Sequence, residues 1–195
     1  ERKNELVKLG KKQGFITYED LASSLKGLDL DSDSLDDLYN VFNENNIAVV
    51  YGGTNVGTMN ALAEGVLFEE GKITGVIPER FVSKSITHDN LSELIITKDI
   101  KERKAIMENL SEAAIILPGS YGTMDELFEY AVNNQLNNLN RPIILFNLDG
   151  FYDPLIAQLK NMEEYGFLTT QLMEMFHNCS DISGIISTIN NFNKQ

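Results

Sequence analysis

Residues 115–126 read Ile115-Ile116-Leu117-Pro118-Gly119-Ser120-Tyr121-Gly122-Thr123-Met124-Asp125-Glu126, and this stretch decides the fold. The apolar segment from Ala113 to Leu117 is too short and too rich in β-branched residues for a helix. A Pro/Gly/Ser loop follows it, and from Met124 onward apolar residues recur at helical spacing. The stretch therefore predicts a strand, a tight loop and a helix that runs from Thr123 to about Leu136.

The loop between that strand and helix has the features of an anion site. Glycines allow a sharp turn, and the helix directs its unpaired N–H groups and the positive end of its dipole at the loop. A phosphate is the usual occupant of such a loop, and Thr123 adds a hydroxyl donor. Turns of this kind also occur in α/β folds without a ligand, so the loop alone leaves both interpretations open.

Two carboxylates, Asp125 and Glu126, lie in the first turn of that helix. Both would repel a phosphate if they pointed into the loop. We expect at least one to point elsewhere, as a partner of the helix dipole or as a catalytic group.

A second junction of the same kind begins at Ile47. The β-branched run from Ile47 to Tyr51 leads into Gly52-Gly53-Thr54-Asn55-Val56-Gly57, and an apolar helix is expected from Met59 to Phe68. Further strands are predicted over 73–77, 94–97 and 142–146. Further helices are predicted over 100–110, from Asp153-Pro154 onward, and over 182–192. Asp99 is expected to cap the helix over 100–110.

This alternation of strands and helices indicates an α/β fold. It predicts a Rossmann-like parallel sheet with right-handed crossovers and helices on both faces. Ligands of such sheets lie at the carboxyl ends of the strands, which is where both glycine loops fall.

Composition excludes several classes of protein. The net charge of −13 over 195 residues disfavours direct binding to nucleic acid or to an anionic membrane. No apolar run reaches the roughly 20 residues of a membrane span. With Cys179 as the one cysteine and only His88 and His177 as histidines, neither a disulfide framework nor a zinc-ligand set can form. We expect a cytoplasmic protein without a metal.

The first 46 residues have a different character. Short amphipathic helices are expected over 4–13, from Thr17 to Leu25 and from about Ser34 to near Asn45-Asn46, and no strand is predicted among them. The chain therefore divides into a small helical module over 1–46 and a Rossmann-like domain over 47–195.

Several motifs in their order and spacing resemble the LONELY GUY family, which comprises cytokinin riboside 5′-monophosphate phosphoribohydrolases. They lie between Ile47 and about Leu168: Tyr51-Gly52-Gly53, Val56-Gly57-Thr58-Met59, Gly75-Val76-Ile77-Pro78, Glu102-Arg103-Lys104, Pro118 to Glu126, and Gly150-Phe151-Tyr152-Asp153-Pro154-Leu155. The resemblance implies hydrolysis of the N-glycosidic bond of a purine nucleoside 5′-monophosphate, in a homodimer, with no cofactor.

The resemblance also implies roles for particular residues. The family's catalytic arginine and glutamate fall on Arg103 and Glu126. Its phosphate-binding loop falls on Gly119, Ser120, Tyr121, Gly122 and Thr123, and Gly53, Lys104 and Asp125 join the substrate site.

The chemistry of these residue types fits that reaction. A carboxylate such as Glu126 stabilises an oxocarbenium-like transition state or positions water. The permanently charged fork of Arg103 can bind oxygens or orient the carboxylate, and Lys104 could add charge for a phosphate. Without the family pattern, Arg103 and Lys104 would be read as a solvated helix face. Tyr121 is a candidate for stacking on a base, and His88 and Cys179 are expected to be structural or surface residues.

The sequence departs from the family pattern at several positions. Ser120 replaces a glycine of the phosphate loop, and Thr54 and Asn60 stand where the family commonly has glycines. Lys101 stands where a histidine is frequent, and Ser85 falls where plant members carry a glutamate. The strand and Cys-Gly-Ser-Ser type loop that normally open the family are absent. That strand is central in the family's sheet.

In its place, residues 4–50 resemble region 1.1 of primary bacterial sigma factors, an acidic helical module that occupies the DNA channel of RNA polymerase. The similarity lies in Gly10 to Asp20, Asp31 to Leu38 and Asn46 to Val49. Two alternatives to the enzyme follow. The chain is a noncatalytic nucleotide-binding scaffold that presents this module to RNA polymerase, or a recombinant fusion without joint function.

Overall fold

The computed structural model describes residues 42–44, 47–82 and 86–192. Residues 42–44 are helical. The rest of the helical module predicted over 1–46 lies outside the described residues, as does Ser85.

After the helical residues 42–44, the described ranges contain six strands and seven further α-helices, with one 3₁₀ turn. In chain order they are β1 (Val49–Tyr51), α4 (Gly57–Phe68), β2 (Ile73–Pro78), α5 (Glu79–Val82), β3 (Glu93–Thr97), α6 (Ile100–Asn109), β4 (Ala114–Ile116), α7 (Tyr121–Leu136), β5 (Ile143–Phe146), η1 (Leu148–Gly150), α8 (Asp153–Glu164), α9 (Thr170–Met173), β6 (Phe176–Cys179) and α10 (Ile182–Phe192).

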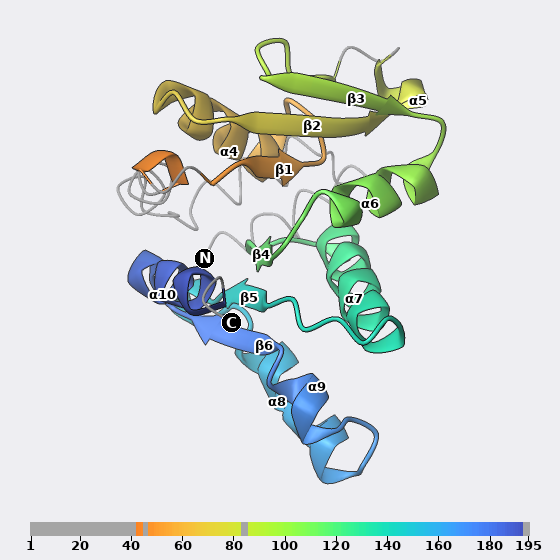
Figure 1. Ribbon diagram of the computed structural model, residues 1–195, viewed down its shortest axis with the longest axis vertical. Coiled ribbons are helices and arrows are strands. Elements are labelled where there is room, and N and C mark those ends of the chain that lie inside the picture. The colour runs from red at the N-terminus through yellow and green to blue at the C-terminus, as the bar shows by residue number, and fades with distance from the viewer. Residues whose placement is uncertain (1–41, 45–46, 83–85, 193–195) are drawn as a thin grey trace, which may run out of the picture.

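The strands form two parallel sheets in the order β1-β2-β3 and β4-β5-β6. Val49 pairs with Ile73 and Val76 with Ile95 in the first, and Ile115 pairs with Ile144 in the second. Figure 1 shows the first sheet above the second, with β1 and β4 as the facing inner edges. The predicted parallel α/β architecture is confirmed, in the form of two three-stranded sheets.

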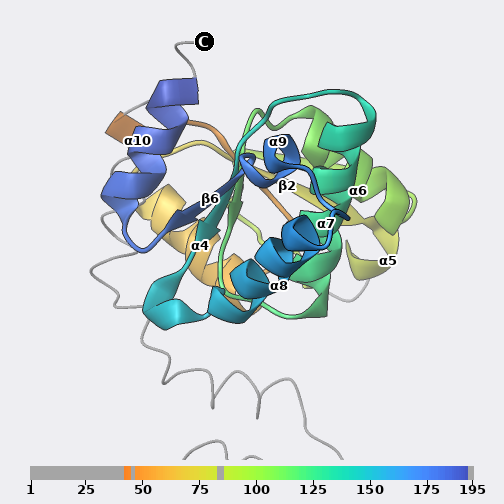
Figure 2. The ribbon, with the colours of Figure 1, turned by 90° about the horizontal axis from the view of Figure 1, so that it is seen from below.

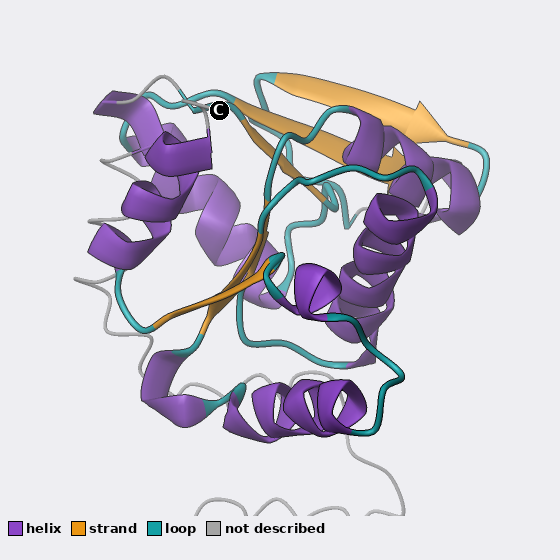
Figure 3. Ribbon diagram, turned by 60° about the horizontal axis from the view of Figure 1, so that its bottom comes forward, coloured by secondary structure: helices purple, strands orange, loops and turns teal. Residues whose placement is uncertain are grey.

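Helices cover both faces of the strands. Figure 2 shows α4 and α10 on one side and α6, α7 and α8 on the other, and Figure 3 shows the strands between these two groups. β5 is apolar on both faces, because Ile144 and Phe146 pack in the core on the α4 and α10 side while Ile143 and Leu145 pack against α7. An uninterrupted apolar run is what a strand buried on both faces requires.

The inner edges β1 and β4 are not paired with each other in the described part of the chain. A cavity of about 430 Å³ separates them on the α4 and α10 side, and one of about 150 Å³ lies on the α6 and α7 side. Val50 and Ile115 line both cavities. Within the described ranges no strand lies between β1 and β4.

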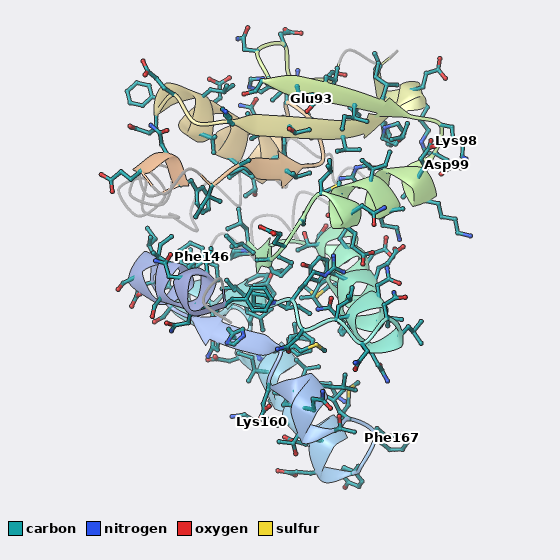
Figure 4. The ribbon with its side chains drawn as sticks, viewed as in Figure 1. Glu93, Lys98, Asp99, Phe146, Lys160 and Phe167 are labelled. Carbon is teal, nitrogen blue, oxygen red and sulfur yellow. The ribbon has the colours of Figure 1, made fainter. Side chains whose placement is uncertain are left out.

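Most predicted elements agree with the structure to within about two residues, and Asp99 caps α6 by accepting a bond from the Glu102 N–H at 2.8 Å. Figure 4 shows Asp99 beside Lys98 at the start of that helix. The sequence did not predict α5, η1, α9 or β6. No helix within the described ranges has the length and apolar character needed to cross a membrane.

Candidate functional site

Both glycine loops emerge from the carboxyl ends of their strands, Gly52 to Val56 after β1 and Leu117 to Ser120 after β4. The crevice between them is the point where the order of the strands reverses, because β2 and β3 lie on one side of it and β5 and β6 on the other. In open parallel sheets this position is the usual place of a ligand.

Arg103 lies in the first turn of α6 and points into this region. Its Nε donates to the carbonyl of Val76 in β2 at 3.1 Å, and its Nη1 donates to Oε1 of Glu126 on α7 at 2.6 Å. The side chain of Arg103 is 12% exposed and that of Glu126 is 36% exposed. A short, partly buried, charge-assisted bond of this kind fixes both side chains.

One of the two carboxylate oxygens of Glu126 forms no hydrogen bond to the described residues. Oε1 accepts from Arg103, whereas Oε2 takes part in no hydrogen bond within the described ranges. The carboxylate also lines the 150 Å³ cavity between α6 and α7. Arg103 therefore orients a carboxylate that is still open to a substrate or a water molecule.

Gly52 makes room for the guanidinium. A Cβ at this position would lie 2.2 Å from Nη2 of Arg103 and 2.7 Å from the sulfur of Met59. The absence of a side chain at Gly52 is therefore a condition for the place that Arg103 occupies.

We expect Gly52→Ala to displace Arg103 and to lower the rate of the reaction proposed below by about tenfold or more, since small misplacements of a catalytic group are costly. Steady-state kinetics and thermal unfolding measure the two effects separately. Gly184→Ala in α10 is the control, because its Cβ would meet the nearest atoms at an ordinary 3.4 Å. An unchanged rate in Gly52→Ala contradicts the role of this glycine.

Lys104, the neighbour of Arg103, bridges the same two helices. Its Nζ contacts Asp125 at 3.0 Å and, more closely, Glu129. The hydrogen bond to Glu129 is the main reason that the pKa of Lys104 is raised. The ammonium is thus held by two carboxylates, and it would have to leave them before contacting a phosphate.

Asp125 and Glu126 have different cationic partners. Asp125 bonds to Lys104 and Glu126 to Arg103, so neither carboxylate is directed at the loop without a cationic partner. This removes the repulsion that two unpaired carboxylates would exert on an anion there.

The loop before α7 is exposed and open. The first bond within the helix runs from the Met124 N–H to the Ser120 carbonyl at 3.1 Å, so the N–H groups of Tyr121, Gly122 and Thr123 have no acceptor within the helix. A Cβ at Gly122 would meet nothing within 4 Å, and one at Gly119 would lie 2.1 Å from the Thr123 hydroxyl. Ser120 adopts an ordinary φ of −105° as the N-cap, and its side chain makes no capping bond.

Tyr121 is almost fully exposed beside the loop. Gly53, in the other glycine loop, has a φ of +75°, and a Cβ there would lie 3.1 Å from Cβ of Ile77. The left-handed conformation and the close approach both require glycine at position 53.

Sequence reasoning missed a hydrogen-bond network that fixes the start of the loop before α7. Tyr152 donates from its hydroxyl to the carbonyl of Leu117 at 2.6 Å, and burial raises the pKa of Tyr152 to about 12, so the donor proton is retained. Asn147 accepts from the Tyr152 N–H at 2.7 Å and donates to Asp153 at 2.8 Å. Only the apolar strand before Asn147 and the Gly-Phe-Tyr-Asp-Pro motif hinted at it.

His88 and Cys179, expected to be structural or surface residues, are both buried. Among the residues with described positions, no group of three or more histidine, cysteine, aspartate or glutamate side chains could hold a metal ion.

The profile of the family described as possible lysine decarboxylase matches residues 59–189. The chain belongs to this family. It is the LONELY GUY family that the motifs resemble. A cytokinin riboside 5′-monophosphate phosphoribohydrolase from Rhodococcoides fascians is 38% identical over 144 residues, which are 73% of this chain and 73% of that protein.

A plant member of the LONELY GUY family gives a shorter match. The probable cytokinin riboside 5′-monophosphate phosphoribohydrolase of Oryza sativa subsp. japonica is 42% identical over 122 residues, 63% of this chain and 55% of the rice protein. The chain thus spans little more than half the length of that relative.

Solved structures support the fold. The molybdenum cofactor binding protein of Rippkaea orientalis has a TM-score of 0.63 at 22% identity, over 84% of this chain and 88% of that one. The molybdenum cofactor carrier protein of Chlamydomonas reinhardtii gives 0.62 at 18% identity, over the same shares of the two chains. At this identity the likeness concerns the fold alone.

A second profile, that of sigma-70 factor region 1.1, matches residues 1–70. It covers the N-terminal part of the chain, where the sequence resembles that module, and overlaps the other match from residue 59 to 70.

Proposed function

We propose that this protein hydrolyses the N-glycosidic bond of purine nucleoside 5′-monophosphates, of the AMP or cytokinin type, to the free base and ribose 5-phosphate. The observation that carries the proposal is the 2.6 Å bond between Arg103 and Glu126 at the carboxyl ends of the parallel strands. Membership of the LONELY GUY family and the activity named for its members support it.

The phosphate would bind at the start of α7. The N–H groups of Tyr121, Gly122 and Thr123 precede the first bond of the helix, and the helix dipole adds partial positive charge. The hydroxyl of Thr123 lies over Gly119 and can donate as well. Four donors on one short loop suit the three oxygens of a phosphate, and Ser120 is accommodated because its backbone is extended.

Glu126 would act on the ribose. Departure of the base leaves positive charge on the sugar ring, and a carboxylate close to the ring stabilises that charge or positions the attacking water. The free oxygen of Glu126 can do either, while Arg103 holds the other oxygen.

A direct assay tests the proposal. The purified full chain is incubated with AMP and with N⁶-isopentenyladenosine 5′-monophosphate, and free base is separated by liquid chromatography. Base should appear with the wild type and not with Glu126→Gln. No base from any purine monophosphate at micromolar enzyme would overturn the proposal.

We also propose a homodimer that uses α7, because the family resemblance implies one and this helix carries an apolar stripe. Tyr121, Phe128, Val132 and Leu136 recur at helical spacing on its exposed side, opposite the buried Leu127 and Tyr130. A stripe on one helix can pair with its own copy across a two-fold axis. Tyr121 at one end would place the partner near the phosphate loop.

We expect Phe128→Glu to convert this dimer to a monomer, since a charge in the centre of an apolar interface is costly. Sedimentation velocity measures the change in mass. Gln158→Glu, at an exposed position on α8 and away from this face of α7, is the control. A wild type that sediments as a monomer, or a Phe128→Glu variant that remains a dimer, contradicts the interface.

Binding to RNA polymerase is a second candidate function, which the match of residues 1–70 to region 1.1 favours. This candidate function assumes that residues 1–46 form a module separate from residues 47–195. It also assumes a protein located in the cytoplasm, where RNA polymerase acts. Core RNA polymerase bound to beads should retain the full chain and lose it when residues 1–46 are deleted. Equal retention of both proteins would contradict this function.

A further inference from the structure

His88 is buried beneath the first glycine loop, with both ring nitrogens engaged. Nδ1 accepts from the Asn90 N–H at 3.3 Å, so Nε2 carries the proton and donates to Oε1 of Glu64 on α4 at 3.0 Å. The His88 side chain is 4% exposed, whereas Glu64 is 65% exposed. The proposed reaction assigns no task to this pair.

The segment that contains His88, residues 86–90, holds the first glycine loop. The Asn55 N–H donates to the carbonyl of residue 86 at 2.9 Å, and the His88 N–H donates to the Gly53 carbonyl at 3.3 Å. Thr54 and Thr87 form an antiparallel bridge between these two bonds. The loop is therefore fastened along its length to segment 86–90.

The same loop forms one wall around Arg103. Gly52 lies against the guanidinium, and Gly53 approaches the N–H of Val76 so closely that a Cβ would be 3.3 Å from it. The carbonyl of Val76 accepts from Nε of Arg103. A shift of segment 86–90 would thus move the surface that positions Arg103, and with it the carboxylate of Glu126.

We propose that His88 is a positioning residue, whose bond from Nε2 to Glu64 anchors segment 86–90 to α4 and thereby holds the Gly52–Gly53 turn against Arg103. The inference rests on the proposed function for its effect on rate. It predicts that loss of this bond lowers kcat and leaves KM nearly unchanged, because the phosphate loop belongs to the other sheet.

Two substitutions test the hydrogen bonds of the two ring nitrogens of His88 separately. His88→Gln retains an N–H donor at the place of Nε2, and His88→Asn retains an acceptor at the place of Nδ1. We expect Gln to keep kcat within about twofold and Asn to lose about tenfold, the scale of a slightly misplaced catalytic group. Asp89→Ala, on the same segment but exposed, is the matched control.

A readout that needs no activity accompanies the kinetics. The Nε proton of Arg103 is hydrogen-bonded to Val76, so its exchange with water, followed by nitrogen-15 NMR of the full chain, reports on the position of the guanidinium. We expect about tenfold faster exchange in His88→Asn and a nearly unchanged rate in His88→Gln.

The outcomes distinguish the two proposals. A wild type that releases no base removes the proposed function, while the exchange of Arg103 still tests the anchor. The inference is overturned if the Arg103 Nε proton exchanges at the same rate, and kcat is the same, in the wild type, His88→Asn and His88→Gln. Equal losses in Asn and Gln also overturn it, because they assign the effect to ring packing and not to the bond with Glu64.

Discussion

Glu126→Gln is expected to abolish release of adenine from AMP and to leave the fold intact. The amide has the shape of the carboxylate but lacks its charge, so it cannot stabilise positive charge on the ribose. We expect kcat to fall by at least about 100-fold, or about 2.7 kcal/mol of barrier. KM should change little, because the proposed phosphate site is the loop before α7 and does not include this carboxylate.

The fold survives because Glu126 is 36% exposed and because the amide oxygen of glutamine can still accept the bond from Nη1 of Arg103. Circular dichroism and thermal unfolding check this point. Glu164→Gln is the matched control, since it makes the same change at an exposed position at the end of α8, outside the site. A rate equal to that of the wild type in Glu126→Gln removes this residue from the mechanism.

The elements that could be predicted from the sequence are those with a strong local cause. The β-branched run before Gly52 and the apolar run before Pro118 form strands because both are short and rich in β-branched residues. Asp99 begins α6 because its side chain accepts the Glu102 N–H. β6 was missed because His177 and Asn178 interrupt its apolar pattern, so it gains its place only by pairing with β5.

The site could be predicted in part for the same reason. The loops are local, so the glycines that form them could be found from sequence. The contact between Arg103 and Glu126 spans 23 positions and depends on how α6 and α7 lie together, which no local pattern specifies. The pairing of Lys104 with Glu129, and the fit of Arg103 against Gly52, likewise appear only in three dimensions.

Arg103→Lys is expected to have an effect close to that of losing Glu126, although it keeps the charge. The guanidinium bonds at once to the Val76 carbonyl through Nε and to Glu126 through Nη1, in two directions set by its planar fork. An ammonium is a single point donor on a flexible stem and cannot reproduce this geometry. We expect kcat to fall by about 100-fold or more, consistent with about 2.7 to 4 kcal/mol for a lost preorganised partner.

Chemical rescue separates the geometry of Arg103 from its contribution to packing. Arg103→Ala leaves space beside Gly52 that a free guanidinium ion can enter, because no side chain at Gly52 blocks it. Added guanidinium at millimolar concentration should restore part of the activity of Arg103→Ala, whereas methylammonium should restore less. Guanidinium should have no such effect on Glu126→Gln. If Arg103→Lys has the wild-type rate, the two hydrogen bonds of the guanidinium, to Val76 and to Glu126, have no part in catalysis. Arg103 then acts through its charge alone.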